Sequence, residues 1–324
     1  CIGSEKMKND VMLSVVIISY NQENYIRDAI ESVINQKTNY KYEILLADDC
    51  SPDNTGKIMK EYADKYPELI RMIPRKRNLG GSANSFDACS RSKGKYICVL
   101  EGDDYWCDVN KIETMVSFLE NNPSYSVVSH TQKGINSDNK VVGYFPNWIN
   151  NDCDITIKDF LNEKHFSLTA SITTNYYLND ELKEKLKIIS SFSRNVGDYQ
   201  KCVFLLDIGK VHIINKPMMV YRYRNDSNNY NSRYSTDEIC LEHLIITKKL
   251  DVFYAGKYNF FKKYLRFFTI GFCYSLIKFK TKSIKKLNKE IPRRKKILVY
   301  ILMPFMAIKI IFEKLFQKIG GKNK

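Results

Sequence analysis

The sequence predicts an α/β fold, in which a mostly parallel β-sheet carries helices on both faces and a basic helical tail follows. Runs that are apolar throughout, such as LSVVIIS at residues 13–19 and YEILLADD at 42–49, are typical of strands buried on both sides of a sheet. Apolar residues at helical spacing in IRDAIESVINQ, at 26–36, predict a helix between these strands. Polar clusters follow the strands, and parallel sheets bind ligands at the carboxyl ends of their strands.

Strands and helices alternate through the first 130 residues. The pattern predicts further helices at 56–66, 83–92 and 111–122, and further strands at 69–74, 95–100 and 125–130. Apolar strands that alternate with helices of this length indicate βαβ units, and therefore a parallel sheet covered on both faces.

Beyond about residue 140 the segments become shorter and more mixed. Strands are expected within 143–148, 168–178 and 211–224, and a helix is expected to begin at or near Asp198. We interpret this half as a continuation of the same domain.

The predicted domain therefore covers residues 12–255, and the tail covers residues 256–324. Residues 1–11 are expected to form a disordered leader, because CIGSEKMKND does not resemble a natural start and Met7 or Met12 would serve as one.

Charge is distributed unevenly along the chain. The net charge is +15, but residues 256–324 hold 19 Lys and Arg against only Glu290 and Glu313, a local charge of +17. Residues 1–255 therefore carry −2. This asymmetry predicts an anionic partner for the tail alone.

The tail alternates apolar and basic runs. Its longest apolar run, Ile297 to Ile308, contains Pro304 and is followed by Lys309, whereas a membrane span needs roughly 20 residues. A span would require Lys309 to snorkel, so we expect a basic amphipathic helix that lies on an anionic membrane surface. The alternative is a helical hairpin that packs its apolar face on the preceding domain. No nucleic-acid partner is expected, because long apolar runs replace the polar residues of such surfaces.

Cysteine and histidine do not predict a metal centre. The nine cysteines form no CxxC pair, and the four histidines are dispersed. An odd cysteine count without a regular spacing argues against a disulfide framework, so reduced thiols are expected.

The stretch VLEGDDYWCD, at 99–108, places Glu101, Asp103 and Asp104 directly behind an apolar strand. Adjacent carboxylates repel each other, and each favours water or a cation. The pair of aspartates, Asp103 and Asp104, suits Mn²⁺ or Mg²⁺, which prefer carboxylate oxygens and keep positions open for substrate phosphates. The alternative is a solvated loop whose acids cap the helix that follows.

Several segments in order resemble the family 2 glycosyltransferases: SVVIISYNQENYIRDAIESVINQ, EILLADDCSPDNT, NLGGSANSFDACSRSKGKYICVLEGDDYW and VGDYQ. The resemblance covers roughly residues 12–225 and implies the GT-A fold. It implies an inverting transfer of a sugar from a nucleotide-sugar, most often a UDP-sugar, with Mn²⁺ or Mg²⁺ as cofactor. It also implies a lipid-linked or polysaccharide acceptor in bacterial cell-surface glycan synthesis, at the cytoplasmic face of the cell membrane.

The resemblance also assigns roles to single residues. Those matching the nucleotide-binding positions are Ile18, Ser19, Tyr20, Asp49, Asn78, Gly80 and Asp103. Asp104 matches the metal ligand, with Asp103 as a second candidate, and Asp198 matches the catalytic base. Without the resemblance, Asp198 would be interpreted as a helix N-cap and Asp49 as a turn residue.

The chain departs from the family pattern in one place. A late motif of the form YR-x-H supplies a histidine in many relatives, but VYRYRNDSNN has Arg224 at that position after Tyr221 and Arg222. An arginine can hold a phosphate but cannot ligate a metal, so Arg222 and Arg224 are predicted phosphate ligands.

Two other functions stay open. The replacement of histidine by Arg224 motivates a catalytically silent, membrane-bound protein that binds a nucleotide-sugar. A nucleotidyltransferase on a similar sheet would favour a glycine-rich, basic first loop, which YNQENY is not.

Overall fold

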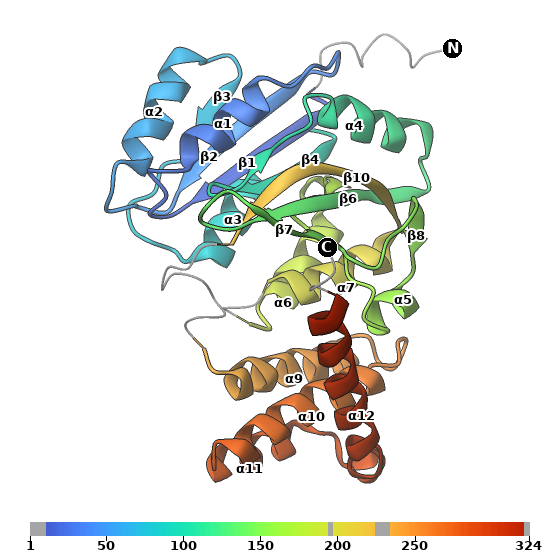
Figure 1. Cartoon of the computed structure of the whole chain (residues 1–324). Helices are drawn as coiled ribbons and strands as arrows, with labels where there is room; N and C mark the ends of the chain where they lie inside the picture. The colour runs from blue at the N-terminus through green and yellow to red at the C-terminus, as the bar shows by residue number, and fades with distance from the viewer. Residues whose placement is uncertain (1–10, 194–196, 224–233, 321–324) are drawn as a thin grey trace. The chain divides into compact units, whose positions relative to one another are not determined.

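A computed structural model of the chain describes residues 11–193, 197–223 and 234–320 (Figure 1). The chain divides into two compact units: residues 1–190 with 201–225, and residues 191–200 with 226–324. The leader predicted at 1–11 lies, except for Val11, outside the described residues.

The first unit begins with the predicted parallel sheet. Strands β1 (Leu13–Ser19), β2 (Tyr42–Asp48), β3 (Ile70–Met72) and β4 (Tyr96–Glu101) pair in the order β3-β2-β1-β4, all parallel. The connecting helices are α1 (Ile26–Ile34), α2 (Thr55–Lys65), α3 (Gly81–Ser90) and α4 (Lys111–Asn121). Figure 1 shows helices covering both faces of the sheet. The α/β prediction is confirmed.

The second half of this unit makes the sheet mixed. The order continues as β4-β9-β6-β10-β5, in which only β6 and β10 pair in parallel, and β7 and β8 lie beside β6 and β10. The strands are β5 (Tyr105–Trp106), β6 (Tyr125–Ile135), β7 (Val141–Phe145), β8 (Cys153–Ile155), β9 (Ile172–Thr174) and β10 (Lys210–Arg222). The helices are α5 (Ile157–Leu161), α6 (Asp180–Ser190) and α7 (Asp198–Ile208), with a 3₁₀ turn at Tyr176–Leu178.

The hydrophobic core lies on both sides of β1. All residues from Leu13 to Ile17 are buried, because helices pack on both faces of the central strands. On α1, the buried residues Ile26, Ala29, Ile30 and Val33 follow the predicted helical spacing. The core therefore holds the carboxyl ends of β1, β2 and β4 in place.

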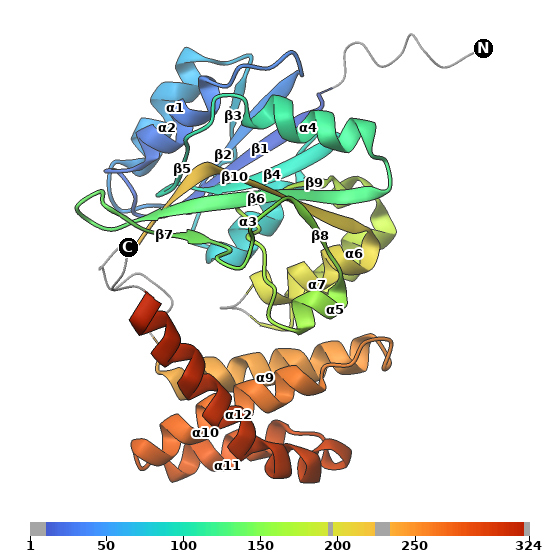
Figure 2. The same ribbon diagram turned by 45° about the vertical axis from the view of Figure 1, so that its right-hand side comes forward.

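The second unit is helical. It contains α9 (Thr236–Phe253), α10 (Phe261–Ile277), α11 (Thr281–Glu290) and α12 (Arg293–Gly320), which Figure 2 shows packed together. The sequence reading did not identify α9, which begins with a capping box at Ser235 and Glu238. Within the part of the chain that the structure describes, no helix has the length and hydropathy needed to cross a bilayer.

The division into units places α9 with the tail, whereas the predicted boundary lay between residues 255 and 256. Ion pairs explain the difference. Lys280 contacts Asp237 at 2.8 Å, Lys248 contacts Glu290 at 3.1 Å, and Lys295 contacts Asp251 at 2.6 Å. Each pair joins α9 to the segment that follows residue 256. Some of the basic residues of the tail therefore form ion pairs within the second unit.

Candidate active site

The carboxyl ends of β1, β2 and β4 are joined by backbone hydrogen bonds. The Asp49 N–H donates to the Ser19 carbonyl at 2.9 Å, and the Gly102 N–H donates to the Ile18 carbonyl at 2.9 Å. A Cβ on Gly102 would lie 2.6 Å from Gln22 Oε1 and 2.9 Å from Ser19 Oγ, so a larger residue would displace these side chains at the strand ends. The convergence of strand ends that the sequence predicted is confirmed for these three strands.

Three carboxylates gather at the end of β4: Glu101, Asp103 and Asp104, named here the carboxylate cluster. One oxygen from each lies within 4.8 Å of the others. Asp104 is almost fully buried, and its Oδ1 accepts a hydrogen bond from the Arg222 backbone N–H at 3.0 Å. Burial, followed by the charges of Asp103 and Glu101, raises the pKa of Asp104 well above its usual value.

The carboxylate cluster fits a divalent cation. Asp104 Oδ2 is buried and has no hydrogen-bond partner among the described residues, which is costly for an ionised oxygen. A hard cation would ligate that oxygen and offset the repulsion among three acids, and oxygen donors are the ones that Mg²⁺ and Mn²⁺ prefer. Glu101, Asp103 and Asp104 are therefore the residues suited to hold it.

Arg222, on β10, contacts both the carboxylate cluster and α1. Its guanidinium donates to the Asp103 carbonyl at 2.7 Å and to Asp28 Oδ2, on α1, at 2.5 Å. The same group lies 4.5 Å from the ring centre of Tyr105. These contacts fix the orientation of the Arg222 side chain, and its predicted role as a phosphate ligand stays a prediction.

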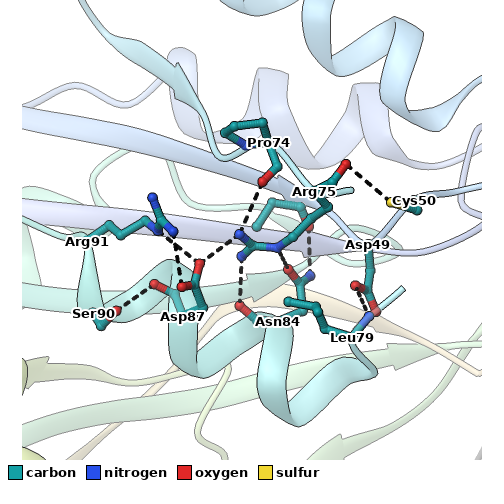
Figure 3. Close-up of polar contacts among 10 residues, drawn as sticks. Asp49, Cys50, Pro74, Arg75, Leu79, Asn84, Asp87, Ser90 and Arg91 are labelled. Carbon is teal, nitrogen blue, oxygen red and sulfur yellow. Dashed lines mark hydrogen bonds and ion pairs between the residues drawn. The ribbon is translucent and has the colours of Figure 1, made fainter. Parts of the chain in front are cut away.

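Asp49 holds the loop before α3. Its Oδ1 accepts from the Leu79 N–H at 2.7 Å (Figure 3). Its Oδ2 accepts from the Gly80 N–H at 2.8 Å, and the Asn78 side chain donates to its carbonyl at 3.0 Å. The structure thus brings together three of the predicted nucleotide-binding residues. The contact of Asp49 with a base stays a prediction.

A buried arginine supports this loop from behind. Arg75 donates to the Asn84 side chain at 2.8 Å and to Asp87 Oδ2 at 2.7 Å, and Asn84 in turn donates to the Ala47 carbonyl of β2 at 2.9 Å (Figure 3). The network ties α3 to the end of β2. It was not predicted, because RKRNLGGS gives no signal that distinguishes a buried arginine from its exposed neighbours.

The remaining predicted residues lie in three different settings. Tyr20 follows β1 and is exposed, and Ile18 and Ser19 end that strand. Asp198 is the first residue of α7, where the helix was expected to begin, and it belongs to the second unit. Its role as a base stays a prediction. Arg224 lies outside the described residues.

Sequence reasoning assigned no site role to Glu101 or Asp28. Glu101 directly follows the predicted strand 95–100, ends β4 in the structure and stands two residues before Asp103, so the alternation of side chains could have signalled it. Asp28 gives no such signal, because its partner Arg222 is 194 residues away in the sequence.

Solved structures with the same fold include TarS from S. aureus. Residues 1–349 of TarS in complex with UDP-GlcNAc superpose with a TM-score of 0.64 at 15% identity, over 92% of this chain and 88% of that one. The complex of TarS 1–349 with UDP gives a TM-score of 0.63 at 16% identity. At this identity the likeness establishes the GT-A-like fold alone.

Several curated relatives match about two fifths of the chain or less. The uncharacterized protein Rv1520 of Mycobacterium tuberculosis is 42% identical over 134 residues, which are 41% of this chain and 39% of that protein. The putative teichuronic acid biosynthesis glycosyltransferase TuaG of Bacillus subtilis is 33% identical over 108 residues, 33% of this chain and 42% of that protein. The match thus spans about two fifths of each relative's length.

The family model described as glycosyl transferase family 2 matches residues 14–181. This is just over half of the chain, and it includes strands β1 to β4 and the carboxylate cluster at their edge. The chain therefore belongs to glycosyl transferase family 2.

Proposed function

We propose that this protein is an inverting glycosyltransferase that moves a sugar from a UDP-sugar to a lipid-linked or polysaccharide acceptor. The carboxylate cluster carries the proposal, because three acids with one unpaired buried oxygen, Asp104 Oδ2, suit a cation that binds a diphosphate. The fold shared with TarS in complex with UDP-GlcNAc supports a UDP-sugar donor. The name of TuaG supports a surface polysaccharide as the product.

The reaction needs one group that stabilises the departing diphosphate and another that accepts the proton of the acceptor hydroxyl. The acceptor oxygen forms a bond to the anomeric carbon, the bond from that carbon to the diphosphate oxygen breaks, and UDP leaves. A divalent cation bound to Glu101, Asp103 and Asp104 would neutralise the charge that develops on the departing diphosphate. Asp198 would accept the proton of the acceptor hydroxyl, and attack from the face opposite the leaving group would invert the anomeric centre.

The described residues support these steps by positioning. The Arg222 backbone N–H holds Asp104 Oδ1, so the other oxygen of Asp104 keeps one orientation. Asp49 holds Leu79 and Gly80, so the loop at the nucleotide side is formed before the donor binds. Both arrangements exist before the substrate binds, so the binding free energy is reduced less by the cost of ordering these side chains and this loop.

We also propose that the second unit binds the anionic cytoplasmic face of the cell membrane. On α12, Ile297, Ile301, Phe305 and Ile308 are exposed at helical spacing, and they are named here the apolar face of α12. The neighbouring Val299 is fully buried, so the helix packs by one side and leaves this face open. Arg293, Arg294 and Lys296 stand beside it at the start of the helix, and basic residues near an anionic surface each contribute about 1 kcal/mol.

The test of the enzymatic proposal is release of UDP from UDP-sugars supplied one at a time, with Mn²⁺ and then with EDTA. Wild type is expected to hydrolyse one donor slowly and to lose this activity with EDTA. Asp104→Asn should lower the rate of UDP release by about 100-fold or more, because a weakly bound cation stabilises the departing diphosphate less in the bond-breaking step. The matched control is Asp64→Asn, a change of the same kind at an exposed acid on α2.

Two results would contradict the proposal. Turnover that survives EDTA and Asp104→Asn would exclude a role for the carboxylate cluster. Binding of a UDP-sugar without any release, with Asp198→Asn identical to wild type and with membrane lipid extract added as a source of acceptor, would favour the catalytically silent binder.

A further inference from the structure

The connection between α10 and α11 exposes three large apolar side chains, named here the apolar turn. Leu276 and Ile277 end α10 and are 50% and 74% exposed, and Phe279, which follows the helix, is 92% exposed. Single exposed apolar residues are common on proteins, but three within four positions form a patch. Because Phe279 is almost completely exposed, its ring contributes little to the packing of the second unit.

The backbone of the apolar turn is also unfavourable for a phenylalanine. The φ angle of Phe279 is 53°, in the left-handed region. The Lys280 N–H donates to the Ser275 carbonyl at 2.8 Å, and the Phe279 N–H donates to the Leu276 carbonyl at 3.1 Å. These two bonds form a Schellman motif, in which the left-handed residue is usually glycine. Phe279 therefore costs the fold both backbone strain and an exposed ring, which indicates that its side chain acts outside the fold.

Helix α11 carries a basic face directly after the apolar turn. Figure 2 shows α11 beside α10, and Leu287 of α11 is fully buried, with its side chain 3.0 Å from the place that a Cβ on Gly271 of α10 would occupy. The lysines on the other side of α11 are exposed and share one helical face, named here the basic face of α11: Lys282, Lys285, Lys286 and Lys289.

The charge around the apolar turn is strongly positive. Residues 276–290 hold six lysines and one acid, Glu290, a local charge of +5. Lys280 pairs with Asp237, and Glu290 pairs with Lys248 of α9. The basic face of α11 and the exposed Lys278 are therefore left to attract an anionic partner.

We propose that the apolar turn inserts into an anionic lipid bilayer while the basic face of α11 binds the lipid phosphates beside it. Lipid would bury the Phe279 ring that the fold leaves exposed, and clustered lysines are attracted to an anionic membrane surface. A protein partner fits less well, because lysine is depleted from protein interfaces. The inference rests on the proposed membrane binding of the second unit, and it adds an attachment point separate from the apolar face of α12.

Insertion is measured with Phe279→Trp, whose fluorescence reports the surroundings of the new indole. The vesicles contain phosphatidylcholine with or without an equal amount of phosphatidylglycerol, and bromine-labelled lipid serves as quencher. With anionic vesicles the emission should shift to shorter wavelength and be quenched, after subtraction of the wild-type signal from Trp106 and Trp148. Val252→Trp is the matched control, because Val252 is 75% exposed on α9 of the same unit. Its emission should not be quenched.

The contribution to affinity is measured by sedimentation with the same anionic vesicles. Phe279→Gly should weaken binding by about tenfold, because it removes the side chain that enters the lipid. The same change relieves the positive φ angle, so the midpoint of urea unfolding should stay the same or rise, which separates weaker binding from misfolding. Val252→Ser should leave vesicle binding unchanged.

The basic face of α11 is tested by Lys285→Gln combined with Lys286→Gln. This change should weaken binding to anionic vesicles by about tenfold at low salt, and the difference from wild type should shrink at high salt, where charges are screened.

Either of two results overturns the inference: emission of Phe279→Trp that does not respond to anionic vesicles, or Phe279→Gly that binds them as wild type does. If Ile301→Glu still weakens binding in that case, the apolar face of α12 is sufficient and only this inference fails. Failure of the proposed membrane binding is a different result, because wild type itself would not sediment with anionic vesicles. That result overturns both and would leave an acidic protein as the partner of the lysines.

Discussion

At the scale of single residues, Lys111 is a buried charge without compensation. It is fully buried at the start of α4, and Nζ has no hydrogen-bond partner among the described residues. Its closest favourable contact is the Trp106 ring, 4.3 Å from Nζ to the ring centre. Burial lowers the pKa of Lys111 from 10.5 to about 8.

This pKa shift predicts how stability depends on pH. Between pH 8 and 10.5 the unfolded chain keeps the Lys111 proton that the folded chain has lost, so the free energy of unfolding rises with pH across this window. Below pH 8 the penalty for burying the charge is fully present, about 3 kcal/mol from the size of the shift.

Lys111→Met should therefore raise the free energy of unfolding at pH 7 by about 2–3 kcal/mol, and the advantage over wild type should shrink as the pH approaches 10. Urea unfolding at several pH values measures this. Lys60→Met, at an exposed lysine, should leave the pH dependence as in wild type. A Lys111→Met variant that is less stable than wild type at pH 7 would show that the ammonium is stabilised in the fold.

At the scale of elements, α3 is held to the sheet by one buried arginine, Arg75. Arg75 and Arg91 both contact Asp87, at 2.7 and 2.9 Å, but the Arg75 side chain is 5% exposed and that of Arg91 is 49% exposed (Figure 3). Both arginines lower the pKa of Asp87. Only Arg75 also bonds Asn84, so only Arg75 links the helix to the core of the sheet.

Arg75→Met should lower the free energy of unfolding by about 2–3 kcal/mol, because it leaves Asn84 and Asp87 without their buried partner. Arg91→Met removes an exposed contact to the same carboxylate and should cost less than about 1 kcal/mol. Urea unfolding of the two variants at neutral pH provides the comparison. Equal losses would mean that burial of the Arg75 side chain does not determine its contribution.

The sequence predicted the first four strands and helices better than the short strands that pair with β10. Helical periodicity and apolar runs were sufficient for β1 to β4 and α1 to α4, whose burial follows the predicted pattern. Strands β5 and β8 have two and three residues, which is too few to show an alternation. These strands exist because β10 offers them backbone partners, which is a property of the sheet.

At the scale of the whole molecule, the proposed membrane binding is assigned to the second unit. Replacing Ile301 by Glu places a charge on the apolar face of α12, which would otherwise be buried in lipid. Binding to vesicles containing anionic lipid should weaken by about tenfold or more, given the roughly 2 kcal/mol that burial of one isoleucine contributes. Sedimentation with such vesicles, at low and high salt, measures the effect.

Val142→Glu is the control, because Val142 is exposed on β7 of the first unit and lies outside α12. It should leave vesicle binding unchanged. Binding that is equal for neutral and anionic vesicles, or unaffected by Ile301→Glu, would contradict the proposed membrane surface.

The sequence by itself determined the α/β class, the parallel first half of the sheet and the position of the carboxylate cluster at the end of β4. These depend on periodicity and on the rule that parallel strands end at one edge, and both can be read within about 15 residues. Only the tertiary structure shows which contacts hold the site residues in place. Arg222 with Asp28 and Asp49 with Gly80 are contacts between distant segments, and only the folded sheet brings such pairs together.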